Sequence, residues 1–506
     1  MRFERLGRPL DAHALSELYA DDPYLCLLEN PGTPTALGRY AFLAVNPFHV
    51  FHSKRDDCFS GPPGDVRKLE GAEPLEALRR LLRHYGGRGG TQAERTLWQS
   101  GMPPFIGGAV GYLGYELLYL IEDIPDLGRD DFAVPDSYLL FCDTVFATDL
   151  IEGQSWVFTH GFGASPEEAG QRADEALRNA MQKLNALASA ANTNASDTNS
   201  DARAKLRAAR AEILERRPRL QEGHLADLGV KPVLTREQYL DVVQKAREHI
   251  FAGDCFEVCT TQRFDCAAPS DTRTLYRVLR SVNEAPFAAY LRFPEVEVAS
   301  SSPERFMQLD RDGWAQTRPI KGTRPRGRTP EQDAALIEDL KTCEKDLAEN
   351  IMIVDLARND LGRVSRFGSV QVPELRIVET YPFTHQMVST VRGQLREGLD
   401  AIDLLRASFP GGSMTGAPKV ESMKIIDALE PVKRGIFSGS IGYFDFDGSF
   451  DLSIVIRTLI QKGDRITFHV GGAVVADSDP AEEYQETLDK AHGLVLAMEL
   501  ARKESK

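Results

Sequence analysis

No run of apolar residues in this 506-residue sequence approaches the length of a transmembrane helix. The first residues, Met1-Arg2-Phe3-Glu4-Arg5, are charged and lack the apolar core of a secretory signal. Acidic residues outnumber basic ones, 75 to 60, so the net charge is −15 and the pI is about 5.3. An acidic surface argues against nucleic acid or an anionic membrane as the main partner. These absences predict a cytoplasmic protein with no nucleic-acid partner and no membrane partner.

Paired cysteine motifs are missing as well. The sequence has seven cysteines, an odd number, and no Cys-x-x-Cys pair that would indicate a zinc site or a redox dithiol. Cys255 and Cys259 are close in sequence, but a metal site would need a second such pair. Reduced structural thiols are therefore the favoured interpretation.

Nucleotide-binding motifs are absent from both glycine-rich segments. Residues 107–115 do not have the Gly-x-Gly-x-x-Gly spacing of dinucleotide-binding folds, so tight packing in a sheet is the preferred explanation. Residues 411–419 resemble a P-loop, but Ala417 and Pro418 follow Gly416 where a P-loop requires lysine. We therefore expect no nucleotide at either segment.

The composition changes along the chain and predicts two domains. Residues 1–183 alternate short apolar runs with turns, which is typical of antiparallel or mixed sheet. Residues 184–201 are mainly Ala, Asn, Ser, Thr and Asp and predict a flexible linker, and a charged helical stretch follows at 202–220. We thus expect an N-terminal domain at 1–183, a linker and charged helix at 184–233, and a second domain at 234–506.

Local signals in the second domain predict an α+β fold. Thr235 is placed to cap a helix that runs through Ile250, and Thr329, Pro330 and Gln332 predict another helix start. Asp479-Pro480 opens a final helix, and glycine turns at 447–448 and 462–464 indicate hairpins. One apolar stripe predicts that the helix from Thr329 continues unbroken past residue 350: Leu336, Leu340, Cys343, Leu347, Ile351 and Val354.

Two predicted helices each carry a pair of acidic residues three positions apart. Asp346 and Glu349 form one pair, and Glu483 and Glu486 form the other. Side chains at this spacing lie on one side of a helix, so the two pairs together could provide the oxygen ligands that Mg²⁺ prefers. The alternative is that Glu486 only forms an ion pair with Lys490, four residues later, on an exposed face.

Three further polar residues have a structural and a functional interpretation. Arg457 lies within the apolar run 452–459, which predicts a strand, so a buried guanidinium there needs an anion, either a carboxylate of the protein or a ligand. His385 is by composition alone most simply a packed, hydrogen-bonded histidine. Lys321 precedes Gly322 and Thr323, where glycine allows a sharp bend and close approach of a ligand.

Five sequence blocks carry a resemblance to a known family. They are residues 302–306, 318–323, 348–356, 410–419 and 483–487. In this order and spacing they resemble the chorismate-binding enzymes, which include anthranilate synthase component I, aminodeoxychorismate synthase component I and the isochorismate and salicylate synthases. The resemblance is strong from about residue 234 to the C-terminus. It implies a layered sandwich of two antiparallel β-sheets flanked by helices.

The resemblance also implies roles for individual residues. Glu349 and Glu486 match the Mg²⁺ ligands of the family, and Asp346 and Glu483 match acids that support its water shell. Arg457 and Lys490 match residues that bind the two carboxylates of chorismate, and His385 matches an orienting or leaving-group contact. The remaining matches to substrate-binding positions are Gly322, Thr323, Ser413, Thr415, Gly416 and Gly472.

Within the family, Lys321 resembles the aminodeoxychorismate synthases, because anthranilate synthases have alanine there. The resemblance implies that Lys321 attacks C2 of chorismate while Glu304 protonates the departing C4 hydroxyl. For this the pKa of Lys321 has to be depressed and that of Glu304 raised. Ammonia would then enter at C4 and expel the lysine, giving 4-amino-4-deoxychorismate, the precursor of p-aminobenzoate in folate biosynthesis, by a transaminase-type transferase.

Other positions bear on the choice within the family. Ser413 replaces threonine and Phe437 replaces tyrosine relative to anthranilate synthase, and Glu257 stands where isochorismate-forming relatives place a lysine that activates water. No glutaminase cysteine elbow is present, so the resemblance implies a separate glutaminase subunit in a heterodimer. Anthranilate synthase component I is the alternative, and a non-catalytic regulatory protein of the same fold is the second.

Overall fold

The computed structural model describes residues 1–86, 101–191, 195–216, 219–381 and 384–504. The strands are β1 (Arg2–Leu6), β2 (Leu25–Glu29), β3 (Tyr40–Lys54), β4 (Asp57–Gly61), β5 (Arg67–Lys68), β6 (Gly108–Leu113), β7 (Ser137–Asp149), β8 (Gln154–Thr159), β9 (Lys231–Pro232), β10 (Glu257–Ala267), β11 (Phe287–Arg292), β12 (Glu297–Ser302), β13 (Arg305–Leu309), β14 (Trp314–Arg318), β15 (Ile320–Pro325), β16 (Gln371–Thr380), β17 (Thr384–Gln394), β18 (Gly416–Ala417), β19 (Ser440–Asp445), β20 (Phe450–Ile454), β21 (Thr458–Lys462) and β22 (Arg465–Val474).

The α-helices are α1 (Ala12–Ser16), α2 (Pro74–Tyr85), α4 (Pro166–Ala191), α5 (Ala195–Arg216), α6 (Glu222–Asp227), α7 (Arg236–Ala252), α8 (Thr272–Val282), α9 (Pro330–Thr342), α10 (Glu344–Gly362), α11 (Ala401–Ser408), α12 (Lys419–Leu429) and α13 (Pro480–Glu504). Short 3-10 helices are η1 (Glu17–Tyr19), η2 (Tyr115–Leu120) and η3 (Gly412–Met414). Over the described ranges, no helix is both long and apolar enough to cross a membrane.

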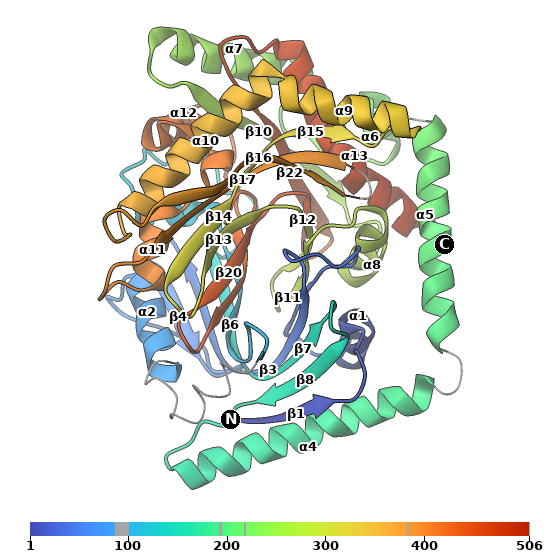
Figure 1. Cartoon of the computed structure of the whole chain (residues 1–506), viewed down its shortest axis with the longest axis vertical. Helices are drawn as coiled ribbons and strands as arrows, with labels where there is room; N and C mark the ends of the chain where they lie inside the picture. Colours follow the sequence, from blue (N-terminus) through green and yellow to red (C-terminus); the bar gives the residue numbers. More distant parts are fainter. Residues whose placement is uncertain (87–100, 192–194, 217–218, 382–383, 505–506) are drawn as a thin grey trace.

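Antiparallel ladders join strands from both ends of the chain. β2 pairs with β11 and β6 pairs with β19, so strands from before residue 183 share ladders with strands from beyond residue 233. The longest ladders are β3 with β7 and β10 with β22. Helices lie outside the strands; α4 runs along the bottom of the molecule and α5 along its right-hand side in the view of Figure 1. The predicted α+β class, with antiparallel sheets flanked by helices, is confirmed, whereas the domain boundaries stay a prediction.

The strands separate distinct hydrophobic cores. Leu25 and Leu27 of β2 pack in a cluster that includes residues of α7, α8 and α13, whereas Cys26 between them packs in a second cluster built mainly from strand residues. Residues of β3 alternate in the same way. This period of two is the signature of strands that are buried on both faces, between a neighbouring layer of strands and the outer helices. Six of the seven cysteines are buried and none of the seven forms a disulfide.

The local signals for helix starts are confirmed. Thr235 caps α7 with the full capping box, in which the Gln238 side chain accepts a hydrogen bond from the Thr235 backbone N–H. Thr329 caps α9 ahead of Pro330, and α13 begins at Pro480. Both glycine turns join antiparallel neighbours, β19 with β20 and β21 with β22.

Two expectations about helices are wrong. The single long helix after Thr329 is broken at Cys343, whose extended backbone (φ −63°, ψ 108°) ends α9 and starts α10. Leu340 and Val354 are buried on either side of this break. The apolar stripe that predicted one helix is therefore made of residues from two successive helices. The segment expected to be a flexible linker is largely helical where it is described, because α4 continues to Ala191 and α5 begins at Ala195.

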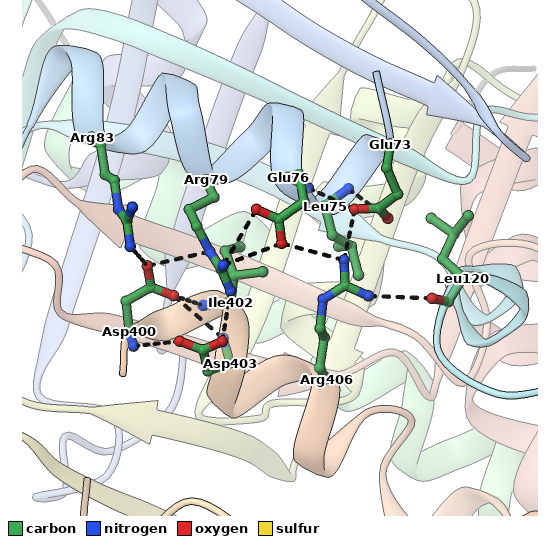
Figure 2. Close-up of polar contacts among 10 residues, drawn as sticks. All are labelled: Glu73, Leu75, Glu76, Arg79, Arg83, Leu120, Asp400, Ile402, Asp403 and Arg406. Carbon is green, nitrogen blue, oxygen red and sulfur yellow. Dashed lines mark hydrogen bonds and ion pairs between the residues drawn. The ribbon is translucent and has the colours of Figure 1, made fainter. Parts of the chain in front are cut away.

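Ion pairs fasten α2 to α11 (Figure 2). Asp400 and Asp403 form the capping box of α11, and Arg79 of α2 contacts both carboxylates at 3.3 and 2.7 Å. Conversely, Glu73 caps α2, and Arg406 of α11 binds the Glu73 carboxylate at 2.6 Å. Each helix therefore provides an arginine to the capping acids of the other. Helix α11 ends at Ser408, immediately before the glycine-rich segment 411–416. The ion pairs between α2 and α11 therefore anchor the chain that leads into the candidate site.

Candidate active site

The backbone bend predicted at Lys321 is a β-bulge in β15. Ile320 pairs with Val388 of β17 and Thr323 pairs with Gln386, so Lys321 and Gly322 together lie opposite one residue. Gly322 has φ 88°, and a Cβ atom there would lie 2.8 Å from Leu340 Cδ1. Only glycine fits this conformation and this space, as is usual for a bulge of this kind. The bulge turns Lys321 into the protein interior, where 8% of its surface is exposed, whereas Thr323 is exposed.

Lys321 lies in an acidic environment. Its Nζ donates a hydrogen bond of 2.6 Å to Glu257 Oε1 and lies 3.9 Å from Glu349 Oε2. Burial by itself would lower the pKa of the lysine, but the carboxylates of Glu257 and Glu349 outweigh it and raise the pKa above its usual value. In this structure the pKa of Lys321 is thus shifted in the direction opposite to the depression that nucleophilic attack requires.

Glu257 is the site residue that the sequence reasoning missed in this role. It lies on β10, is fully buried, and its second oxygen, Oε2, has no hydrogen-bond partner. The sequence singled it out only as a departure from the lysine of isochorismate-forming relatives. No local signal could place it beside Lys321, because the two residues are 64 positions apart and meet only through their side chains in the folded protein.

Acidic residues of α10 and α13 converge on the ammonium of Lys345. Lys345 Nζ lies 3.9 Å from Glu349 Oε1 and 3.8 Å from Glu483 Oε1. Glu349 Oε1 and Glu483 Oε2 are buried without hydrogen-bond partners. Burial raises the pKa of Glu349 to about 7, and burial together with Glu486 raises that of Glu483. Asp346 instead forms an ion pair of 2.8 Å with Arg324.

This acidic cluster has the chemistry of a cation site. Unpartnered buried carboxylate oxygens are costly unless a cation neutralises them, and oxygen donors suit Mg²⁺. As the chain stands, no three acidic, histidine or cysteine side chains of the described ranges are close enough together to hold a metal ion. Half of the Lys345 side chain is exposed, so it can leave the cluster without disturbing the core. Glu349, Glu483 and Glu486 therefore fit a divalent cation that would replace this ammonium.

The ion pair of Glu486 with Lys490 is also present. Lys490 Nζ lies 2.6 Å from Glu486 Oε1 and donates a second hydrogen bond of 2.6 Å to the Gly471 carbonyl. Burial would raise the pKa of Glu486, but Lys490 lowers it. The pair does not lie on a remote face: a Cβ atom on Gly472 would come within 2.6 Å of Glu483 Oε2 and 3.6 Å of Glu486 Oε1. Gly472 leaves open the space directly in front of these acids.

Glu304 and Ser413 meet beside Ile320, whose backbone N–H donates to Glu304 Oε1 at 3.4 Å. Ser413 Oγ donates to Glu304 Oε1 at 2.9 Å, and the pKa of this buried acid is raised to about 7, chiefly by burial. Half-protonation near neutral pH is the property expected of an acid that protonates a leaving group. Thr415 is buried and its hydroxyl bonds carbonyls of its own loop. Gly416 pairs with Val258 of β10, and a Cβ atom there would lie 2.0 Å from the Glu257 carbonyl oxygen.

Arg457 does not lie inside a strand, which corrects the sequence prediction. It is in the break between β20 and β21 and has a left-handed backbone conformation, with φ 53°. Its guanidinium donates to the carbonyl of Lys490 at 2.6 Å. Across the residues described here, no carboxylate lies within ion-pair distance of it, and burial lowers its pKa. A partly hidden guanidinium without a counter-ion, next to Lys490, is suited to bind a carboxylate.

His385 has the hydrogen-bonding pattern of a structural residue. It is fully buried; its Nδ1 is 2.9 Å from Thr380 Oγ1 and its Nε2 is 2.8 Å from Asp333 Oδ1. Both ring nitrogens are therefore engaged within the protein. In this conformation the imidazole links β16, β17 and the first turn of α9, which stand beside the Lys321 strand.

Comparisons with known proteins agree with this geometry. Aminodeoxychorismate synthase from Streptomyces pristinaespiralis is 38% identical over 506 residues, which cover 96% of this chain and 63% of that relative. This chain therefore spans less than two thirds of that protein. Aminodeoxychorismate synthase component 1 from Bacillus subtilis (strain 168) is 34% identical over 469 residues, covering 93% and 91% of the two chains. Anthranilate synthase component 1 from Aquifex aeolicus (strain VF5) is 35% identical over 476 residues, covering 94% and 89%.

The fold has relatives among solved structures too. Anthranilate synthase component I from Streptococcus pneumoniae superimposes with a TM-score of 0.72 at 28% identity, covering 90% of this chain and 92% of that one. The family model for the chorismate binding enzymes matches residues 25–495. That range includes every residue assigned to the candidate site above. The chain belongs to the chorismate binding enzymes.

Proposed function

We propose that this protein aminates chorismate at C4 to give 4-amino-4-deoxychorismate. The observation that carries the proposal is the position of Lys321, which is buried among the site acids and not on the surface. A buried amine beside unsaturated substrate carbon can act as a nucleophile. Relatives named as aminodeoxychorismate synthases support the proposal.

The side chains of the site suit the two halves of this reaction. In the first, Lys321 Nζ would give up a proton, for which Glu257 Oε1 at 2.6 Å is the acceptor, and form a bond to C2. Both conjugated ring double bonds would shift and the C4 hydroxyl would leave as water, with its proton from Glu304. In the second, ammonia would form a bond to C4 and return a proton to Glu304, both double bonds would shift back, and Lys321 would leave C2 and recover its proton from Glu257. The net change is chorismate plus ammonia to aminodeoxychorismate plus water.

Mg²⁺ is part of the proposal. Glu349 and Glu486 would hold it, with Glu483 and Asp346 close by, after Lys345 has moved out of the cluster. When bound, Mg²⁺ would neutralise the carboxylates and draw charge from a carboxylate-bearing ring. Arg457 and Lys490 would orient the substrate carboxylates, and Gly472 leaves room for a ligand in front of the acids.

The ammonia source is proposed to be a separate glutaminase subunit that forms a heterodimer with this chain. The sequence has no glutaminase cysteine elbow, so this chain alone should use ammonium salts but not glutamine. Below about pH 7, where Glu304 keeps its proton, the rate with ammonium should rise with pH as the fraction of free ammonia grows. Formation of product from glutamine by the isolated chain would contradict the proposal.

Anthranilate synthesis is the second candidate, because a relative of similar identity is named anthranilate synthase component 1. The two reactions differ in a simple way: anthranilate formation releases pyruvate, whereas aminodeoxychorismate keeps the enolpyruvyl group. The test is to incubate the protein with chorismate, ammonium and Mg²⁺, then to identify the product by mass spectrometry and to measure pyruvate. We expect aminodeoxychorismate without pyruvate. Anthranilate with pyruvate would favour the alternative, and no consumption of chorismate would favour a regulatory protein.

A further inference from the structure

Arg434 is a buried arginine outside the sequence blocks that resemble the family. It follows α12, is 2% exposed, and all five of its N–H groups have acceptors. Its Nε and Nη2 bind the two oxygens of Glu430 at 2.8 and 2.6 Å. Its Nη1 donates to the Met414 carbonyl at 2.7 Å and to Ser438 Oγ at 3.2 Å, and its Nη2 also donates to the Cys259 carbonyl at 2.7 Å.

The two carbonyls that Arg434 binds belong to the two backbone segments that form the site wall. Met414 stands between Ser413, the hydrogen-bond partner of Glu304, and Thr415. Cys259 is two residues beyond Glu257, the partner of Lys321. The Cys259 N–H in turn donates to the Thr415 carbonyl at 2.8 Å. A single guanidinium thus holds the segment that carries Ser413 against the strand that carries Glu257.

Neighbouring residues fix the position of the Arg434 guanidinium. Glu430 also accepts hydrogen bonds of 2.9 Å from the backbone and the hydroxyl of Thr261 on β10. The guanidinium lies 4.6 Å from the ring centre of Tyr115 in η2, an element of the N-terminal half. The charge pair is therefore satisfied on every side, which is the condition under which a buried ion pair holds one geometry.

We propose that Arg434, oriented by Glu430, is a positioning residue that sets the distance between the Ser413 and Glu304 side of the site and the Glu257 and Lys321 side. The reaction whose rate Arg434 would affect is taken from the proposed function. The hydrogen bonds of Arg434 do not depend on that proposal. Lysine cannot replace arginine here, because one ammonium cannot bind a carboxylate and two carbonyls that diverge from it in the directions of a planar fork. Displacement of reacting groups by about 1 Å can lower a rate by about 100-fold.

The test compares Arg434→Lys with a matched control, Arg263→Lys. Arg263 is also buried and binds Asp131 with two hydrogen bonds of 2.6 and 2.7 Å. It is on β10, the strand of Glu257 and Cys259, but it bonds neither Met414 nor Cys259. For each variant we would measure kcat, KM for chorismate, the dissociation constant of chorismate, the pH profile of kcat and the melting temperature. We expect kcat/KM to fall about 100-fold in Arg434→Lys and to stay within about twofold of wild type in Arg263→Lys. The two variants should lose similar amounts of stability.

The pH profile separates positioning from stability alone. A displaced segment loosens the Ser413 to Glu304 hydrogen bond, which normally lowers the pKa of Glu304. The alkaline limb should therefore move to higher pH in Arg434→Lys and not in the control. If Arg434→Lys does not fold, Glu430→Gln takes its place. This variant keeps both contacts of Arg434 with backbone carbonyls but weakens its orientation. We expect a smaller fall in kcat/KM and a smaller shift of the alkaline limb. Wild-type kcat, KM, chorismate affinity and pH profile in a folded variant at either position would overturn the inference.

The proposed function is judged separately, by the product that the wild type forms. If wild type makes another product, the ratio of variant to wild type for that product still decides the role of Arg434. If wild type binds chorismate without turnover, the ratio of dissociation constants decides it.

Discussion

Replacing Lys321 by alanine tests both the packing and the proposed chemistry. A lysine on an exposed loop can be removed at a cost within about 0.5 kcal/mol. Lys321 is only 8% exposed and its partner Glu257 is fully buried, at 2.6 Å. Removing one member of a buried pair leaves the other charge without compensation, which costs about 3–5 kcal/mol. We therefore expect Lys321→Ala to lower the free energy of unfolding by that amount.

The rate should fall much further than this loss of stability explains. If Lys321 forms a bond to the substrate, its removal deletes a step, and we expect turnover to fall at least about 1,000-fold, equivalent to roughly 4 kcal/mol of transition-state stabilisation. Chorismate binding should change little, because the carboxylate contacts at Arg457 and Lys490 remain. The assays are aminodeoxychorismate formation, equilibrium binding of chorismate and denaturant unfolding.

A double variant separates the two effects. In Lys321→Met combined with Glu257→Leu both charges are gone, and apolar replacement of a buried pair is often neutral or stabilising. This variant should recover most of the lost stability and none of the activity. Lys245→Ala is the control, since Lys245 is 54% exposed and forms only an i,i+4 pair with Asp241. Unchanged stability and unchanged product formation in Lys321→Ala would refute the reasoning.

Two further predictions concern the acids of the site. Glu349→Gln and Glu486→Gln should each abolish the Mg²⁺ response and turnover with the fold intact by circular dichroism, because each removes a proposed ligand charge; full wild-type activity in excess EDTA would contradict this. The pKa of Glu304 is about 7, so its proton-donating form is lost as the pH rises through 7, and kcat measured at constant free ammonia should fall there. Ser413→Ala removes a hydrogen bond that lowers this pKa, so the alkaline limb should move to higher pH; a limb that stays in place would show that Glu304 is not the titrating acid.

Some features of the protein follow from short stretches of sequence. The starts of α7, α9 and α13 were predictable because a cap residue satisfies backbone N–H groups within its own turn, as Thr235 does with Gln238. The bend at Lys321 was predictable because only glycine at position 322 tolerates the left-handed conformation, and the hairpin turns follow for the same reason. The helix break at Cys343 was missed, although Glu344 and Asp346 just beyond it are typical of a helix start.

Other features depend on contacts between residues far apart in sequence, which no local pattern encodes. The sequence alone identified Lys321 and the family, but not Glu257 as the lysine's partner, because that contact joins side chains of two strands that are far apart in sequence. The direction of the Lys321 pKa shift was set by this tertiary contact, since nearby carboxylates outweigh burial. Arg434 likewise read as an ordinary charged residue after α12 until the fold brought the Met414 and Cys259 carbonyls to it. Local hydrogen bonds and side-chain periodicity determine the elements; the arrangement of charges in the site is decided only when the elements pack.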